Sequence, residues 1–252
     1  MEKHNKYTGE RLVSSEKILN PMRVENLARF KFFLSKFQRG RILDLGCGNG
    51  EGTYFLSQNE GMMSIGIDIS SEVLRIAHQE YSLIPFFQMD VCSLAFNNHT
   101  FDGVVSVEVI EHVLNPMAYL MESYRVLKPG GVFMLTTPNR LRTRPPTGTG
   151  SSWPAHVREY TPNELLEMLS RLYSSIDLWG QSVPIYENNI IRKSIYFFAP
   201  FIKPLLPRFI RINFLPTLQY RIKPEIGYDD IFFSKEEVEE SPTLVVVCKK
   251  EK

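Results

Sequence analysis

The stretch "VEVIEH" at positions 107–112 contains residue types that could perform acid–base or metal chemistry. Glu108, Glu111 and His112 come directly after an apolar run, "FDGVVSV", which predicts a buried strand. If the chain becomes helical at this point, residues three and four apart share a face, so the two carboxylates and the imidazole point the same way. The triplet could then be a metal site, an acid–base apparatus or the polar rim of a pocket.

A glycine loop, "DLGCGNGEG" at positions 44–52, follows the short apolar run "RIL". Glycines at a strand-to-helix turn let the backbone approach a ligand and adopt angles that a Cβ would forbid. The pattern is GxGxG, whereas the dinucleotide fingerprint GxGxxG needs a glycine where this chain has Glu51. The preceding Asp44 favours a cationic or amino-bearing ligand over a pyrophosphate.

Two further aspartates stand at the ends of apolar runs. Asp68 ends "SIGID", where a carboxylate can accept hydrogen bonds from both hydroxyls of a ribose. Asp90, in "QMDVCSL", is followed by apolar residues and could meet the amino edge of a flat base. Together with the glycine loop they are expected to line one crevice.

These candidate sites depend on how strands and helices alternate along the chain. Alternating apolar runs and helical patterns predict βαβ units and a parallel sheet with helices on both faces. Ligands bind such sheets beyond the carboxyl ends of the strands, where every polar cluster above falls. The expected strands are 41–45, 63–68, 84–90, 101–107, 131–138, 174–181 and 243–250, and the expected helices are 20–37, 54–59, 71–81, 116–127 and a segment from 161. Thr161 and Glu164 predict a capping box for the last helix.

In order and spacing, "ILDLGCGNGEGTYFL", "GIDIS", "MDVCSL", "FDGVVSVEVIEHV" and "LKPGGVFMLTTPN" resemble the successive motifs of class I S-adenosylmethionine-dependent methyltransferases over residues 40–139. The resemblance implies an α/β fold with a Rossmann-like, doubly wound sheet of seven strands, the last antiparallel. It also implies S-adenosylmethionine as cofactor. The resemblance further implies which residues bind the cofactor. Asp44, Gly46, Cys47, Gly48 and Gly50 would surround its methionine part, and Asp68 would hold the ribose. Ile69, Asp90 and Val91 would contact the adenine, and Glu108 is a further implied cofactor-binding residue. Cys47 is expected to fill space in the loop, because no histidine base is near it in sequence.

A narrower resemblance is to ubiquinone, menaquinone and glycan methyltransferases, through "YTGERLV" and "AHVREYTPNEL". It implies that the N-terminal segment folds over the cofactor and brings Tyr7 and Arg11 to its carboxylate or to the substrate. The implied reaction is O-methylation of a small-molecule, lipid-linked or sugar hydroxyl. The alternatives are C- or N-methylation of a quinone-like acceptor, a non-catalytic cofactor-binding protein on the same fold, and a nucleotide-dependent oxidoreductase, which the missing glycine disfavours.

Methylation of a hydroxyl requires a group that takes its proton. The catalytic candidates are Glu111, His112 and His156, although His112 could instead only shape the pocket. A divalent cation held by Glu108, Glu111, His112 and His156 is a second possibility, since the spacing resembles that of metal-dependent small-RNA 2′-O-methyltransferases. Because the same spacing is common in relatives without known metal, a cation is not the default expectation.

Residues 188–223 are basic and aromatic and contain no acidic residue. They could pack on the domain, cap the acceptor site or contact a membrane peripherally, whereas prolines and charges break every apolar run too early for a membrane span. One domain is expected, with a 1–39 extension, a 40–182 cofactor-binding core, a 183–241 inserted cap and a 242–252 final strand. A net charge of +1 speaks against nucleic acid, and the scattered cysteines and polar start favour a cytoplasmic protein.

Overall fold

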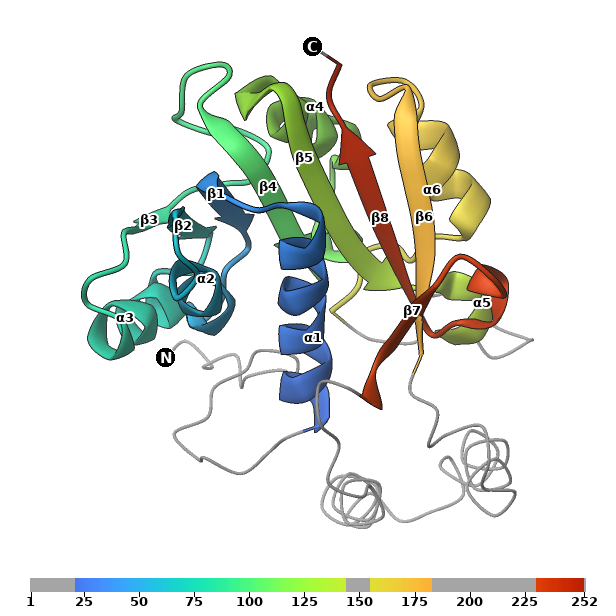
Figure 1. Cartoon of the computed structure of the whole chain (residues 1–252), viewed down its shortest axis with the longest axis horizontal. Coiled ribbons are helices and arrows are strands. Elements are labelled where there is room, and N and C mark those ends of the chain that lie inside the picture. The colour runs from blue at the N-terminus through green and yellow to red at the C-terminus, as the bar shows by residue number, and fades with distance from the viewer. Residues whose placement is uncertain (1–20, 144–154, 183–229, 252) are drawn as a thin grey trace, which may run out of the picture.

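A computed structural model of the protein describes residues 21–143, 155–182 and 230–251 (Figure 1). Tyr7 and Arg11, and the expected contact segment 188–223, lie outside the described residues. The strands are β1 (Gly40–Leu45), β2 (Met62–Asp68), β3 (Phe86–Gln88), β4 (Phe101–Val107), β5 (Leu127–Pro138), β6 (Ser175–Ser182), β7 (Phe232–Ser234) and β8 (Thr243–Lys249). The helices are α1 (Pro21–Lys36), α2 (Glu51–Ser57), α3 (Ser71–Glu80), α4 (Pro116–Val126), α5 (Arg140–Thr143) and α6 (Pro162–Leu169), with 3₁₀ turns η1 (Ile110–His112) and η5 (Val238–Glu240).

The strands form one sheet in the order β3-β2-β1-β4-β5-β8-β6-β7. The β1–β2, β2–β3, β1–β4 and β4–β5 pairs are parallel, while β8 runs antiparallel to both β5 and β6. The predicted doubly wound sheet with an antiparallel last strand is therefore confirmed. It has one strand more than the seven expected, because the short β7 adds to the edge of β6 from within the segment expected to be a cap.

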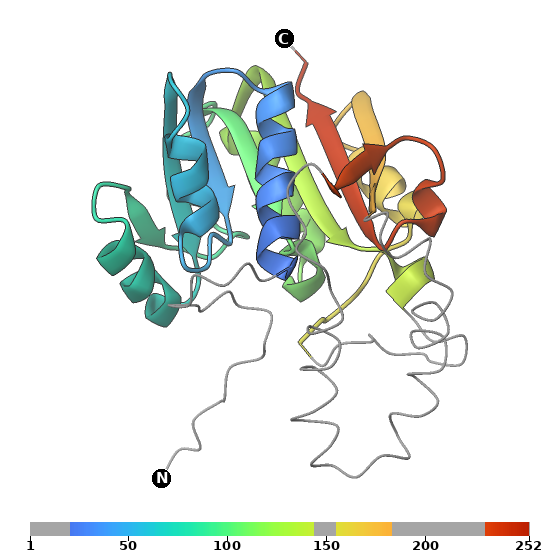
Figure 2. The same ribbon diagram turned by 60° about the horizontal axis from the view of Figure 1, so that its bottom comes forward.

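The sheet is covered on both faces. Because successive side chains of a strand point to opposite faces, the hydrophobic core forms two clusters, one on each face. Val104 and Phe133 pack in one cluster with residues of α4 and α6, and their neighbours Val105 and Met134 pack in the other with α1 and Leu56 of α2. Figures 1 and 2 show α1 crossing one face while α4 and α6 lie behind the other. Both layers thus hold the strand ends in fixed positions.

Local sequence signals account for the starts of α2 and α6. The predicted capping box is present at α6, where the Thr161 side chain accepts from the Glu164 N–H and the Glu164 carboxylate accepts from the Thr161 N–H. Helix α2 starts at Glu51 rather than near 54, because Gly50 in the left-handed region turns the chain directly into the helix. Within the described ranges, no helix combines the length and apolar character needed to cross a bilayer.

Candidate active site

The glycine loop joins β1 to α2 at the carboxyl edge of the sheet. Gly46, Gly48 and Gly50 all have positive φ, at 71°, 56° and 82°, which L side chains rarely adopt. A Cβ on Gly46 would lie 2.5 Å from Cγ2 of Val109, whereas a Cβ on Gly48 would meet nothing within 4 Å. The loop therefore packs against the segment after β4 at one glycine and leaves its backbone accessible at the next.

Asp44, at the end of β1, is a buried carboxyl beneath this loop. It is 1% exposed, and its Oδ2 accepts a hydrogen bond of 2.7 Å from the Thr53 hydroxyl. Burial raises the pKa of Asp44 to about 7; the Thr53 hydrogen bond opposes this rise and the charge of Asp68 adds to it. An incoming cation would favour the ionised form of this carboxyl.

Asp68 ends β2 and faces the same loop. Its two oxygens accept from the backbone N–H groups of Gly48 at 3.0 Å and Ser70 at 2.9 Å. A carboxylate oxygen has two lone pairs, so each can still accept a ribose hydroxyl. Ile69, next in the chain, is 63% exposed, which is a position suited to covering an adenine ring.

Asp90 and Val91 follow β3 at the same edge of the sheet. The Asp90 side chain is exposed, and its Oδ1 accepts from the Cys92 N–H at 2.8 Å in a local turn. That turn leaves the backbone of Asp90 and Ser93 joined by a short bridge. Asp90 and Val91 therefore lie just after β3, and their contact with the adenine stays a prediction.

Cys47 lies inside the glycine loop and is 9% exposed. Burial, with the nearby charges of Asp44 and Asp68, raises the pKa of the Cys47 thiol well above its ordinary value. Its sulfur would lie 2.8 Å from a Cβ on Gly66. The thiol therefore fills space between loop and β2 and is a poor nucleophile.

Glu108 directly follows β4 and has an unusual backbone, with a φ of 56°. Its N–H donates to the Thr136 carbonyl at 3.2 Å, and its Oε1 accepts from the Thr136 hydroxyl at 3.0 Å. Arg29 of α1 forms an ion pair with the same oxygen at 3.2 Å. Because these contacts turn the carboxylate toward β5 and α1, Glu108 does not share a face with Glu111.

Arg29 is a buried cation that ties α1 to the centre of the sheet. Its side chain is 5% exposed, and besides Glu108 it donates to Gln181 of β6 at 2.6 Å, to Thr243 of β8 at 3.3 Å and to Asn26. Arg29 was not anticipated from the sequence, since its partners are up to 214 residues away. No local pattern signals such a contact.

Arg29→Met is expected to lower the free energy of unfolding by about 2–4 kcal/mol, because Glu108, Gln181 and Thr243 lose their shared donor and a partly buried carboxylate loses its counter-ion. Urea unfolding followed by far-UV circular dichroism measures this. Arg171→Met, which removes an exposed ion pair with Glu167, is the control and should cost below about 0.5 kcal/mol. Equal losses in the two variants would contradict the role given to Arg29.

Glu111, in η1, is a fully buried carboxyl group with 0% exposure. Its Oε2 accepts from the Thr137 hydroxyl at 2.9 Å, while Oε1 has no hydrogen-bond partner among the described residues. Burial, followed by the nearby charge of Glu108, raises the pKa of Glu111 well above its ordinary value. An orphaned oxygen on a buried carboxyl indicates a place for a proton, a ligand or a cation.

Two imidazoles complete this cluster. One ligand atom each of Glu111, His112 and His156 lie within 4.8 Å of one another, and the two rings meet edge to face with centroids 4.9 Å apart. His156 is brought to η1 because the Val157 and Arg158 N–H groups both donate to the Glu111 carbonyl. We call Glu111, His112 and His156 the acid–base cluster.

The structure brings three of the four expected metal ligands together and leaves out the fourth. Glu108 is not in the acid–base cluster, since Arg29 and Thr136 hold its carboxylate. The helical expectation for "VEVIEH" is confirmed only over Ile110–His112, because Val107 ends β4 and the left-handed Glu108 separates that strand from a 3₁₀ turn of three residues. Thr136 and Thr137, the donors to the two glutamates, were also missed.

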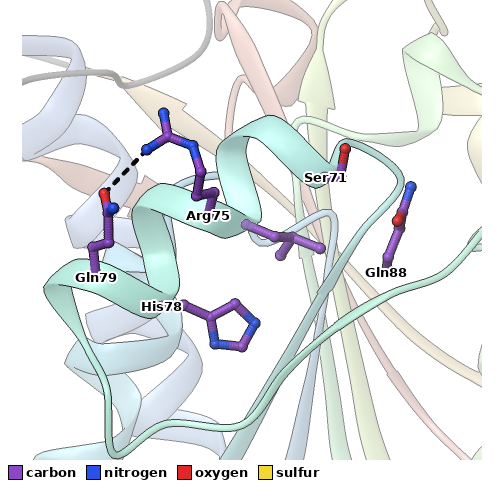
Figure 3. A pocket seen from close by; sticks show the side chains of 6 residues that line it. Ser71, Arg75, His78, Gln79 and Gln88 are labelled. Atoms are coloured by element: carbon purple, nitrogen blue, oxygen red, sulfur yellow. Dashed lines mark hydrogen bonds between the residues drawn. The ribbon is translucent and has the colours of Figure 1, made fainter.

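An open depression of about 440 Å³ lies between α3 and β3 (Figure 3). Its polar lining comes from Ser71, Arg75, His78, Gln79 and Gln88, and the Gln88 amide donates to the Ile69 carbonyl at 2.9 Å. None of these residues belongs to the acid–base cluster or the glycine loop. Its lining adjoins Ile69 through the Gln88 hydrogen bond.

The sheet order, the glycine loop after β1 and the acidic residues after β2 and β3 define a class I methyltransferase fold. Residues 43–135 match the family model described as "Methyltransferase domain". Residues 43–135 therefore carry the methyltransferase domain that the sequence motifs predicted, and S-adenosylmethionine is the cofactor of this class.

Curated relatives agree with this assignment. Over 128 residues the chain is 32% identical to a probable S-adenosylmethionine-dependent methyltransferase of Mycolicibacterium smegmatis. This alignment covers 51% of this chain and 49% of the relative. It is 41% identical over 108 residues to the mitochondrial ubiquinone biosynthesis O-methyltransferase of Rattus norvegicus, covering 40% of this chain and 31% of the relative. The chain thus spans about half or less of the length of these relatives.

A solved structure shares the fold over nearly the whole chain. An S-adenosylmethionine-dependent methyltransferase of Thermotoga maritima superposes with a TM-score of 0.62 at 16% identity, covering 91% of this chain and 90% of that one. At this identity the likeness concerns the fold alone.

Proposed function

We propose that the protein transfers a methyl group from S-adenosylmethionine to a hydroxyl of a small-molecule, lipid-linked or sugar acceptor. The observation that carries the proposal is the acid–base cluster, which packs beside the glycine loop through the contact of Val109 with Gly46. Hydroxyl methylation needs a proton acceptor at this place, whereas amine methylation can proceed by positioning alone. The O-methyltransferase named among the relatives supports the same choice.

Different residues of the crevice would bind different parts of the cofactor. Asp44 and the loop glycines would hold the methionine part, Asp68 the ribose, and Ile69, Asp90 and Val91 the adenine. The cofactor supplies a methyl group on a sulfonium, and its leaving group departs neutral. The chain's own contribution is to align the acceptor oxygen with that methyl, exclude water and take the acceptor proton. The buried carboxyl of Glu111 and the imidazoles of His112 and His156 are the groups that can take it.

The acid–base cluster also fits a divalent cation. A buried carboxyl oxygen without a partner and two imidazoles are a plausible partial donor set for Mg²⁺, Mn²⁺, Fe²⁺ or Zn²⁺. Glu111, His112 and His156 would hold it. When bound, the cation would lower the pKa of the acceptor hydroxyl. Metal analysis of the purified protein and turnover before and after chelation test this, and full activity in metal-free protein excludes a catalytic cation.

Calorimetric titration should show binding of S-adenosylmethionine and none of NAD, because the loop lacks the third fingerprint glycine. Asp68→Ala is expected to weaken S-adenosylmethionine binding at least tenfold, since a charged acceptor for the ribose hydroxyls is lost. Formation of S-adenosylhomocysteine with a panel of hydroxyl and amine acceptors then distinguishes an enzyme from a binding protein. Turnover with amines only would refute O-methylation.

A further inference from the structure

Glu159 is a buried carboxylate that sequence patterns did not single out. It lies between His156 and α6 and is 0% exposed. Oε1 lies 2.9 Å from Nδ1 of His156, and Oε2 accepts from the hydroxyl of Thr143. Both oxygens of this buried carboxyl group therefore lie against polar groups of the protein, although the Thr143 hydroxyl also has the Asn139 carbonyl within hydrogen-bond distance.

This contact determines which nitrogen of His156 carries the proton. The ionised form of Glu159 can only accept, so with this form Nδ1 is the donor, and in the neutral ring the lone pair is then on Nε2. The Nδ1 atom of His112 is also the donor, because it lies 3.0 Å from the carbonyl oxygen of Ala155, which can only accept. Both imidazoles of the acid–base cluster thus have Nε2 as their basic nitrogen.

The two imidazoles differ in what holds them. His112 is exposed and has a neutral carbonyl at Nδ1, whereas the His156 side chain is 6% exposed and has a charged acceptor. A carboxylate behind an imidazole orients the ring and raises the basicity of its other nitrogen. The pair Glu159–His156 is therefore the more strongly oriented of the two.

We propose that Glu159 is a positioning residue for methyl transfer, holding His156 in the Nδ1-protonated form so that Nε2 is the nitrogen of this ring that can accept a proton or bind a cation in the acid–base cluster. The inference rests on the proposed function. It assigns a role to a side chain that itself lies behind the reacting groups. The two residues are three positions apart in a segment that is neither helix nor strand, so the spacing alone does not predict their contact.

The test compares Glu159→Ala and Glu159→Gln with wild type in the full-length protein. Glu159→Gln keeps the volume of the side chain, but its amide can donate to Nδ1 and so no longer selects one tautomer. We expect kcat to fall about tenfold in both variants, within the 10–100-fold effect of such outer partners, while the Kd for S-adenosylmethionine changes less than about twofold. Glu164→Gln, a matched change in the α6 capping box, should leave kcat within about twofold of wild type.

Imidazole ¹⁵N spectra report the tautomer directly and need no acceptor. Wild type should show His156 protonated at Nδ1, and Glu159→Gln should shift signal toward the Nε2-protonated form. The proposal is overturned by an Nε2-protonated His156 in wild type, by unchanged kcat in Glu159→Gln, or by an equal loss in Glu164→Gln. If wild type gives no S-adenosylhomocysteine with any acceptor, the proposed function fails, and the spectra still decide whether Glu159 positions His156.

Discussion

Asp44→Asn is expected to weaken S-adenosylmethionine binding about 100-fold at pH 8 and only a few-fold at pH 5.5. Asp44 is buried with a pKa of about 7, so at pH 8 wild type presents a carboxylate to the cationic ligand, and at pH 5.5 a neutral carboxyl. A hydrogen bond to a charged group is worth about 1.5–3 kcal/mol, or roughly 10–150-fold in affinity. Asparagine resembles the neutral form at every pH.

The measurement is calorimetric titration of wild type and variant between pH 5.5 and 8. Wild-type affinity should rise with pH up to about 7 and then level off, whereas that of the variant should show no such rise, because ligand binding drives a proton off Asp44 only in wild type. Asp102→Asn is the control: this carboxylate lies at the far end of β4, is paired with Lys128, and should leave binding unchanged. A wild-type affinity independent of pH would contradict the role of Asp44.

Without ligand, Asp44→Asn should be more stable than wild type at high pH, although it binds S-adenosylmethionine more weakly. The pKa of Asp44 is raised on folding, so its contribution to stability is complete below its ordinary pKa and is lost as the pH rises through about 7. Asp44→Asn avoids ionising a buried carboxyl, and its amide oxygen can still accept from Thr53. The variant should therefore match wild type at pH 4 and exceed its free energy of unfolding by up to about 4 kcal/mol at pH 8, as urea unfolding would show.

The features predicted correctly from the sequence depend on short-range patterns. The glycines of the loop, the strand-ending Asp68 and the capping box of α6 each require only neighbours within a few residues. The period of two along the strands and the parallel order follow from the alternation of apolar runs with helices. These signals sufficed to predict the sheet and to bring Asp68 to the glycine loop at its carboxyl edge.

The features that the sequence missed depend on contacts between distant segments. Arg29 forms an ion pair with Glu108, which is 79 residues further along the chain. This contact holds the Glu108 carboxylate outside the group of Glu111, His112 and His156, so Glu108 is not among the clustered metal-ligand candidates. The left-handed backbone at Glu108 is stabilised by Thr136 on the neighbouring strand, which a helical pattern does not reveal. Strand β7 is three residues long, too short to give a period.

The two buried acids of the site have raised pKa values for the same reason but suit different tasks. Asp44 lies under the glycine loop and Glu111 under the imidazoles, and burial is the largest cause of the shift in both. A carboxyl beneath a cationic ligand is stabilised in its ionised form when the ligand binds. A carboxyl beside two imidazoles can instead exchange a proton with them and with the acceptor. Binding and proton transfer are thus separable by mutation.

Glu111→Gln is therefore expected to lower kcat by about 100–1000-fold while the Kd for S-adenosylmethionine stays within about threefold of wild type. A positioned general base contributes roughly 10²–10⁴-fold, and glutamine keeps the shape and the hydrogen bond from Thr137 without accepting a proton. If Glu111 is the base, wild-type kcat falls as the pH drops through its raised pKa, because the active form is the carboxylate.

Steady-state production of S-adenosylhomocysteine across pH measures both effects. Glu167→Gln on α6, which changes an exposed carboxylate paired with Arg171, is the control and should leave kcat unchanged. Thr137→Val should give an intermediate loss, because it keeps the base and removes its hydrogen-bond donor. Should Glu111→Gln retain kcat within threefold, proton removal would pass to His112 and His156, and the buried carboxyl would serve only to hold η1 in place.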